Sequence, residues 1–150
     1  MTTAPPAPTS PVTDDGELTQ RWAELLTPGR PQEATLWLAW LRPDGTMVPT
    51  LIPIDELAEH DTSALGSGLL TLHDAIAIAE RCDRDALHLT LTLERPGPLA
   101  EDPSEMDEEW CELLEEAVTR GLDQGCSFHV SDGRSVRQLM PRRFWPQPRR

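Results

Sequence analysis

Lysine, asparagine and tyrosine are absent from this chain of 150 residues, so all 13 basic side chains are arginines. The absence of lysine excludes Schiff-base chemistry. No apolar run approaches the roughly 20 residues needed to cross a bilayer. Met1–Gly16 has neither the basic region nor the apolar core of an export signal. We therefore expect a cytoplasmic protein with no membrane segment, and the bias toward Ala, Gly, Pro, Arg and Leu is typical of a GC-rich bacterial genome.

Cysteine is also scarce. The three cysteines, Cys82, Cys111 and Cys126, are an odd number, and no two of them form a Cys-x-x-Cys pair. Without an export signal, this pattern argues against a disulfide framework. Each cysteine falls at an apolar-patterned position, so we expect buried free thiols.

Charge of one sign dominates most of the chain. The formal net charge is −13, but residues 1–133 hold all 26 acidic residues and 7 arginines, whereas residues 134–150 hold 6 arginines and no acid. An acidic body is a poor partner for a phosphate backbone, because affinity for nucleic acid comes largely from Lys and Arg. The charge therefore favours another protein as the partner, and it leaves the oligomeric state open.

Hydrophobic periodicity predicts eight elements in the order α-β-β-α-β-α-β-β. This order is typical of an α/β or α+β fold with a single mixed sheet of about five strands and about three helices packed on it. The predicted ranges are Glu17–Thr27, Glu33–Leu41, Thr46–Ile54, Leu69–Cys82, Ala86–Leu93, Ser104–Leu122, Cys126–Val130 and Arg134–Leu139. They form one globular domain over residues 17–140, between a disordered Pro-rich N-terminus (1–16) and a basic aromatic C-terminal tail (141–150).

Local signals refine three of these segments. Pro49 and Pro53 cannot donate ladder hydrogen bonds, so their strand should lie at a sheet edge or leave the sheet early. The polar segment Asp55–Gly68 contains two glycines and is expected to form a loop or a single helical turn. Ser104, followed three residues later by Asp107, resembles a capping box at the start of the longest helix.

Signatures of catalysis or metal binding are missing. The four histidines, His60, His73, His88 and His129, show no i, i+4 pair and no accompanying Cys pair. We expect them to be ordinary surface or half-buried residues. There is no Gly-x-Ser-x-Gly elbow and no phosphate-binding loop. The sequence therefore predicts no catalytic residues, no metal site and no cofactor.

Nine of the 16 residues from Glu101 to Glu116 are acidic. Such a run could bind Ca²⁺ or Mg²⁺, but the EF-hand pattern is missing. A solvated helix face is the favoured interpretation, because like charges repel one another into water. The same face could present a negative patch to a basic partner. The candidate contact residues in it are Glu108, Glu109, Glu112 and Glu116.

The tail contains Arg142, Arg143, Phe144 and Trp145 between prolines that forbid a regular helix. Three interpretations stay open. The aromatic side chains could fold back onto the body while the arginines neutralise acidic residues. The segment could instead be an exposed docking peptide, since Trp and Arg are typical hot-spot residues. It could also contact nucleic acid through Arg and stacking aromatics.

The stretch Ala86–Gly133 contains a strand, a Pro/Gly loop, the sequence Pro103-Ser104-x-x-Asp107, a long helix, a strand and a turn. It resembles the core of the JAB/MPN metallopeptidase-like fold, especially its bacterial RadC-like branch. In that branch a strand ending in His-x-His-Pro precedes Pro-Ser-x-x-Asp at the start of a long helix. The resemblance covers roughly residues 33–139.

The departures from that family pattern lie at the metal ligands. Leu93 and Arg95 stand where the family has its two histidines, while Ser104 and Asp107 match the family's Ser and Asp. One residue more separates Arg95 from Ser104 than in the family. Because Arg cannot ligate a metal, the resemblance implies a relative that lacks the metal site and is not an enzyme.

These observations predict a non-catalytic domain that binds another protein through its acidic helix face, its Arg/aromatic tail, or both. One alternative is a hydrolase-like enzyme whose site is assembled from dispersed residues such as His88, Glu94, Asp107 and His129. Another is an acidic inhibitor or immunity-type protein that covers a basic partner.

Overall fold

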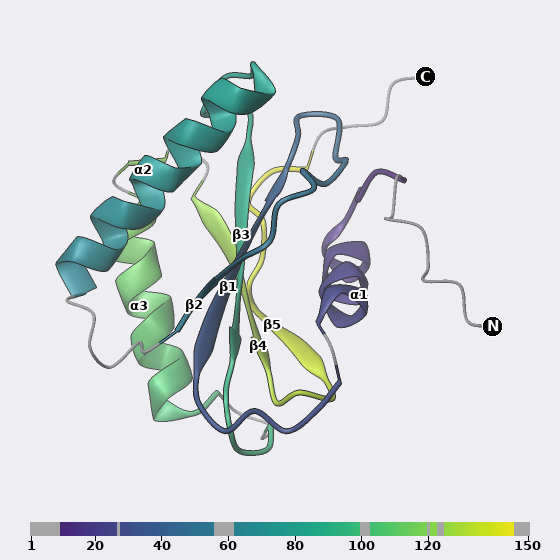
Figure 1. Ribbon diagram of the computed structural model, residues 1–150, viewed down its shortest axis with the longest axis vertical. Helices are drawn as coiled ribbons and strands as arrows, with labels where there is room; N and C mark the ends of the chain where they lie inside the picture. The colour runs from purple at the N-terminus through teal and green to yellow at the C-terminus, as the bar shows by residue number, and fades with distance from the viewer. Residues whose placement is uncertain are drawn as a thin grey trace.

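The computed structural model describes residues 10–26, 28–55, 62–99, 103–119, 121–122 and 125–145. These residues form a five-stranded sheet with helices on both faces (Figure 1). The strand order is β2-β1-β3-β4-β5, in which β3 and β4 are parallel and the other neighbours are antiparallel. The predicted single mixed sheet of five strands with three helices, in the order α-β-β-α-β-α-β-β, is confirmed.

The helices and strands are interspersed along the chain. Their bounds are α1 Asp15–Leu25, β1 Thr35–Leu41, β2 Ile52–Ile54, α2 Thr62–Glu80, β3 His88–Glu94, α3 Glu105–Thr119, β4 Cys126–Ser131 and β5 Val136–Met140. Parallel neighbours need a crossover, and α3 provides it between β3 and β4. Helix α1 covers one face of the sheet, and α2 and α3 cover the other (Figure 1).

Helix α1 begins at Asp15, two residues before the predicted start. The Asp14 side chain caps it by accepting a hydrogen bond from the Glu17 N–H at 2.8 Å. Upstream, Val12 is 1% exposed, and its N–H donates to the Gly45 carbonyl at 2.8 Å. The composition predicted disorder over Met1–Gly16, but this one apolar anchor packs the described part of that segment against the domain. Residues 1–9 lie outside the described residues.

Helix α2 begins at Thr62, seven residues before the predicted start at Leu69. The prediction of a loop or single turn over Asp55–Gly68 is therefore wrong for residues 62–68, and residues 56–61 lie outside the described part of the chain. Leu65 and Gly66 are buried. Packing of these first turns outweighs the poor helix propensity of the two glycines, since propensity is a weak preference that tertiary contacts override.

Strand β2 lies at the edge of the sheet, as its prolines predict. Only three residues pair with β1, and the register places Pro53 opposite Trp37. Between Leu41 and β2, a single bridge from Leu41 to Met47 continues the pairing. Pro53 has no N–H to offer, so this short strand makes a poor template for pairing with another chain.

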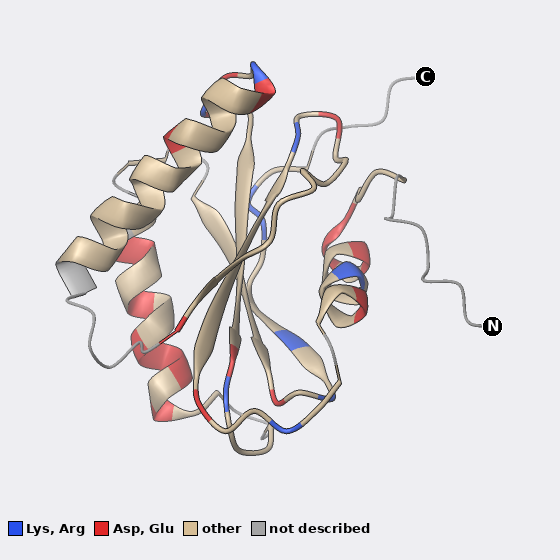
Figure 2. Cartoon of the chain, viewed as in Figure 1, with Lys and Arg blue, Asp and Glu red and all other residues tan. Residues whose placement is uncertain are grey.

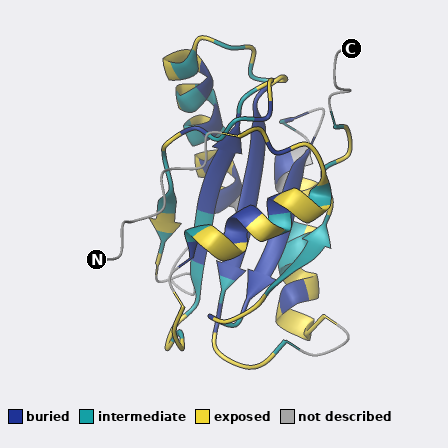
Figure 3. Cartoon of the chain, turned by 90° about the vertical axis from the view of Figure 1, so that its right-hand side faces the viewer, coloured by how far each residue is buried: buried dark blue, intermediate teal, exposed yellow. Residues whose placement is uncertain are grey.

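Both faces of the inner strands β3 and β4 are buried, whereas β5 is half-buried (Figure 3). On the side of α2 and α3, the core includes Leu36, Leu91, Leu114 and Phe128. On the side of α1, a smaller cluster gathers around Trp22. As a result, every residue from His88 to Leu93 and from Cys126 to Ser131 is buried. The polar residues that alternate with the core residues on these strands therefore lie beneath α1 and not in water. No helix in the described ranges is long and apolar enough to span a membrane.

Candidate functional site

A hollow of about 400 Å³ lies between the segment that follows β5 and the residues that lead into β3. Its lining comes from three separate parts of the chain: Pro43, then Asp85, Ala86, Leu87 and His88, and finally Arg142, Phe144 and Trp145. Three of the four predicted tail residues thus line one hollow. The fourth, Arg143, is exposed and is not among the lining residues.

The tail is fixed to the domain by two contacts. Trp145 is half-buried and packs against the cluster around Trp22, and the Arg142 backbone N–H donates to Asp15 Oδ1 at 3.1 Å. The Arg142 guanidinium carbon lies 4.8 Å from the centroid of the Trp145 ring, a cation–π contact. The described part of the tail therefore folds back onto the domain through Trp145, whereas Phe144 keeps 66% of its surface exposed.

Arg142 is a cation in a partly desolvated position. Burial lowers the pKa of Arg142 from its ordinary value, and the charge of Asp15 acts in the opposite direction. Its NH1 and the indole Nε1 of Trp145 are buried and have no hydrogen-bond partner among the described residues. None of the acidic side chains that the structure describes forms an ion pair with Arg142. The hollow is therefore lined by a positive charge that has no ion-pair partner among the described residues.

The hollow is also lined by His88, which is 3% exposed. His88 Nε2 lies 2.9 Å from Ser127 Oγ, the Ser127 hydroxyl donates to Thr90 Oγ1 at 2.7 Å, and Trp22 Nε1 donates to the same Thr90 oxygen at 2.9 Å. Burial lowers the pKa of His88 well below its usual value, with smaller contributions from Arg142, His73 and His129. His88 is thus a neutral, fixed side chain at this site.

Further along the same face, His129 is fully buried. Its Nε2 lies 3.1 Å from Thr19 Oγ1 in α1, and its ring centroid is 6.4 Å from that of Trp22. Burial lowers the pKa of His129 to about 4. The prediction of surface or half-buried histidines is wrong for His73, His88 and His129, which are buried because helices cover both faces of the sheet. His60 lies outside the described residues.

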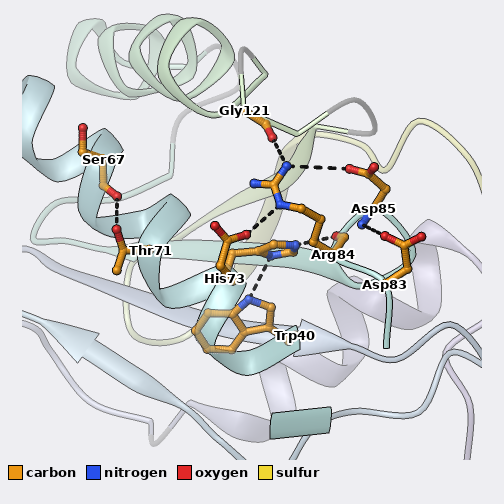
Figure 4. Close-up of polar contacts among 9 residues, drawn as sticks. Trp40, Ser67, Thr71, His73, Asp83, Arg84, Asp85 and Gly121 are labelled. Carbon is orange, nitrogen blue, oxygen red and sulfur yellow. Dashed lines mark hydrogen bonds and ion pairs between the residues drawn. The ribbon is translucent and has the colours of Figure 1, made fainter. Parts of the chain in front are cut away.

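His73 in α2 holds a structural position (Figure 4). Its Nδ1 accepts from Trp40 Nε1 at 3.3 Å, and its Nε2 lies 2.7 Å from the Arg84 carbonyl, to which it must donate. Both ring nitrogens are therefore satisfied in a single neutral tautomer. Burial lowers the pKa of His73, which agrees with that state. With no free nitrogen, His73 has no capacity for acid–base chemistry in this arrangement.

Arg95 and Asp107 form a buried, bidentate ion pair. Arg95 Nε and NH2 donate to the two Asp107 carboxylate oxygens, each at 2.7 Å. The capping box is confirmed by reciprocal hydrogen bonds of 3.1 Å between Ser104 and Asp107. Burial on its own would raise the pKa of Asp107, but the bonds from Arg95 and Ser104 outweigh it and hold the pKa below its usual value. The JAB/MPN resemblance that involves these residues stays a prediction.

The dispersed residues of the enzyme alternative do not converge. His88 begins β3 and Glu94 ends it, so roughly 20 Å of strand separates them. His129 is paired with Thr92 in the ladder, and both carboxylate oxygens of Asp107 are bound to Arg95. In the part of the chain that the structure describes, no three His, Cys, Asp or Glu residues gather as metal ligands.

The cysteines are free thiols, as predicted, although only Cys126 is fully buried and the other two are half-buried. Burial raises the pKa of Cys126 to about 12 and that of Cys111 to about 11, and it also raises the pKa of Cys82. Because the thiolate is the reactive form, none of the three is poised as a nucleophile.

The described part of the acidic run lies along α3, where Figure 2 colours the Asp and Glu positions red, and its glutamates are exposed while Asp107 is buried. The four predicted contact residues, Glu108, Glu109, Glu112 and Glu116, are all exposed. This face lies on the side of the sheet opposite α1, whereas Trp145 and Arg142 contact the side of α1. The two predicted interaction surfaces are therefore separate.

No family model, curated protein or solved structure matches this chain. Its function is therefore inferred from the geometry of its sites. The sequence singled out the tail residues for partner binding, and His88 only for the enzyme alternative, whereas Pro43 and Asp85 were not considered; these residues join the tail only in three dimensions. The one local signal was the place of His88 on the polar side of an alternating strand, opposite the leucines.

Proposed function

We propose that this chain is a non-catalytic domain that binds another protein through the hollow at Arg142, Phe144 and Trp145. The observation that carries the proposal is a partly desolvated guanidinium without an ion-pair partner among the described residues, beside an aromatic ring that is 66% exposed. Arginine and aromatic side chains dominate the energetics of protein interfaces. A folded domain gains little from exposing Phe144 unless a partner covers it.

The geometry also limits the entropy cost of binding. Arg142 is stacked on Trp145, and its backbone is bonded to Asp15. Side chains that are already ordered lose less conformational freedom when a partner arrives. The three free thiols fit the cytoplasmic location that the sequence predicts, since the cytosol keeps thiols reduced.

The test is affinity capture from the native cell extract with four forms of the full chain: wild type, Arg142→Gln, Phe144→Ala and Arg143→Gln. The last is the matched control, because it removes the same charge one position away without altering the lining of the hollow. We expect a partner that wild type and Arg143→Gln retain, and that Arg142→Gln and Phe144→Ala lose. Identical partner sets for all four forms would refute the proposal.

A second candidate is an acidic inhibitor or immunity-type protein that covers a basic partner with α3. It is favoured by the exposure of Glu108, Glu109 and Glu112, none of which pairs with a basic side chain of the described residues. Such a complex would weaken steeply as salt rises, because exposed charges are screened. Glu108→Gln/Glu112→Gln would weaken it, whereas Arg142→Gln would leave it unchanged. A complex insensitive to both salt and the double variant would exclude this candidate.

A further inference from the structure

Building on the proposed function, we infer that the hollow is a receptor for a carboxylate group on an apolar stem, as found at the end of a peptide chain or on an acidic side chain of the bound protein. Hydrogen-bond donors that have no partner within the described fold point to this chemistry of the bound segment.

Two such donors belong to residues that line the hollow. NH1 of Arg142 and Nε1 of Trp145 lack a hydrogen-bond partner among the described residues, and both atoms are buried, so a ligand that bonds to them must displace the side chains that cover them. Buried donors without partners are uncommon, because each costs the free energy of its lost hydration. A guanidinium matches the two oxygens of a carboxylate in a planar, bidentate geometry. The cation–π contact with the Trp145 ring holds the Arg142 guanidinium beside the second of these donors.

The same chain shows how it stabilises a buried arginine elsewhere. Arg95 is 7% exposed and is bound at 2.7 Å by both carboxylate oxygens of Asp107. Arg142 has no equivalent within the described residues. Asp15 is the nearby acid, but its Oδ1 already accepts from the Arg142 backbone N–H and from Gln138 Nε2, both at 3.1 Å. The ligand therefore supplies to Arg142 the carboxylate that Asp107 supplies to Arg95.

The walls of the hollow determine what carries the carboxylate. Pro43, Ala86, Leu87 and Phe144 give it apolar surface, and its volume of about 400 Å³ accommodates a few amino-acid residues. The carboxylate of Asp85 also lines the hollow and repels further negative charge on a ligand. Arg84 NH1 lies 3.9 Å from the Asp85 carboxylate and offsets part of that repulsion. A compact apolar group ending in a single carboxylate fits these surroundings better than a highly charged anion.

The experiment follows the Trp145 indole N–H of the ¹⁵N-labelled full chain by NMR, with the signal assigned through Trp145→Phe. The probes are N-acetyl-phenylalanine, its neutral amide, N-acetyl-aspartate amide and inorganic phosphate. We expect a carboxylate probe to shift the Trp145 signal, and the neutral amide to bind about tenfold or more weakly, because it lacks the charge-assisted bond. The stronger of the two carboxylate probes identifies a chain end or a side chain as the source.

Substitutions at Arg142, Arg143 and Asp85 are expected to have different effects on the affinity for the carboxylate probes. Arg142→Gln should weaken carboxylate binding about ten- to hundredfold, Arg143→Gln should change it less than about twofold, and Asp85→Asn should strengthen it. If Arg142→Gln does not fold, Arg142→Lys replaces it and should still weaken binding, because it keeps the charge but loses the planar fork. Equal binding of acid and amide, equal effects at Arg142 and Arg143, or phosphate binding as strong as that of the carboxylates would overturn the inference.

These outcomes are independent of the capture experiment. A captured protein that needs Phe144 and Arg142, together with carboxylate probes that do not bind, would leave the proposed function standing and refute the carboxylate. Carboxylate probes that bind at Arg142, together with identical capture by every variant, would refute the proposed function and leave the carboxylate site standing.

Discussion

Trp22 in α1 donates its indole N–H to the hydroxyl of Thr90 in β3 at 2.9 Å, across 68 residues of sequence. Both side chains are fully buried, so this bond joins the α1 layer to the polar face of the sheet. The same Thr90 oxygen accepts from Ser127, which in turn contacts His88 beside the hollow. One hydrogen-bond network therefore connects Trp22 of α1 with His88, which lines the candidate site.

Replacing Trp22 with Phe tests this connection. The substitution keeps an aromatic ring but removes the donor, and we expect the free energy of unfolding to fall by about 1–3 kcal/mol, because Thr90 loses a partner in a buried setting. Urea unfolding followed by circular dichroism measures it. Trp37→Phe is the matched control, since Trp37 Nε1 has no hydrogen-bond partner among the described residues. Equal losses for the two variants would contradict the role of the bond.

Acid should destabilise the domain through His129. Burial lowers the pKa of His129 to about 4 in the folded chain, while the unfolded chain keeps the ordinary value of about 6.5. Between these two values the unfolded state binds a proton that the folded state does not. Above pH 6.5 the contribution of His129 to the free energy of unfolding is therefore complete. As the pH falls toward 4, the free energy of unfolding decreases by about 3 kcal/mol in total.

Urea unfolding at a series of pH values measures this dependence. The comparison is with His129→Gln, in which the slope between pH 6.5 and 4 should become shallower, with the remainder due to groups such as His88, whose pKa is also lowered by burial. Parallel curves for wild type and His129→Gln would show that His129 does not carry the effect.

Breaking the buried ion pair should have the largest effect on stability. Arg95→Met leaves the Asp107 carboxylate buried without its guanidinium, and such a change costs about 3–5 kcal/mol. Ser104→Ala removes only the hydroxyl of the capping box, which costs about 1 kcal/mol. Chemical denaturation of the two variants should therefore rank them in that order. A smaller loss for Arg95→Met than for Ser104→Ala would mean that the helix cap, and not the ion pair, holds Asp107.

Two glycines should respond to alanine in opposite ways. An added Cβ at Gly68, on the exposed face of α2, has no atom within 4 Å, so Gly68→Ala should stabilise the chain by about 0.5–1 kcal/mol. Gly133 has φ +92°, and a Cβ there would collide with the Gly29 carbonyl oxygen. Gly133→Ala should destabilise by more than about 1 kcal/mol. Thermal unfolding of both variants measures the effect, and a change of the same sign at both sites would be the contrary result.

Local patterns in the sequence were enough to predict the order of elements and the mixed sheet. The alternation in Ala86–Leu93 and the helical stripe after Ser104 depend on near neighbours, as does the capping box that Asp107 completes. Propensity failed where tertiary packing decides, as in the first turns of α2, where Leu65 and Gly66 are buried. The prediction for the histidines failed for a related reason. Whether the polar side of a strand meets water depends on a helix, α1, that lies far away in the sequence.

The candidate site was predictable only in part. Arg142, Phe144 and Trp145 stood out by composition, but the tail gave no indication of where it would dock. Asp85 and His88, which line the hollow opposite the tail, lie more than 50 positions upstream of it. No local pattern in a single sequence indicates that two such distant segments come together. Arg142 is desolvated because the tail docks on the domain, and the residues next to Arg142 in the sequence do not indicate this burial.

The partners of α1 also have a consequence for synthesis of the chain. Its side chains bond to Thr90, His129 and Gln138, which follow it by 68, 110 and 123 residues. A ribosome releases α1 long before these residues exist, so α1 completes its docking late in synthesis. Until β4 and β5 are made, α1 lacks two of these three partners, and a translating chain stalled at that point would offer its incompletely packed side chains to chaperones.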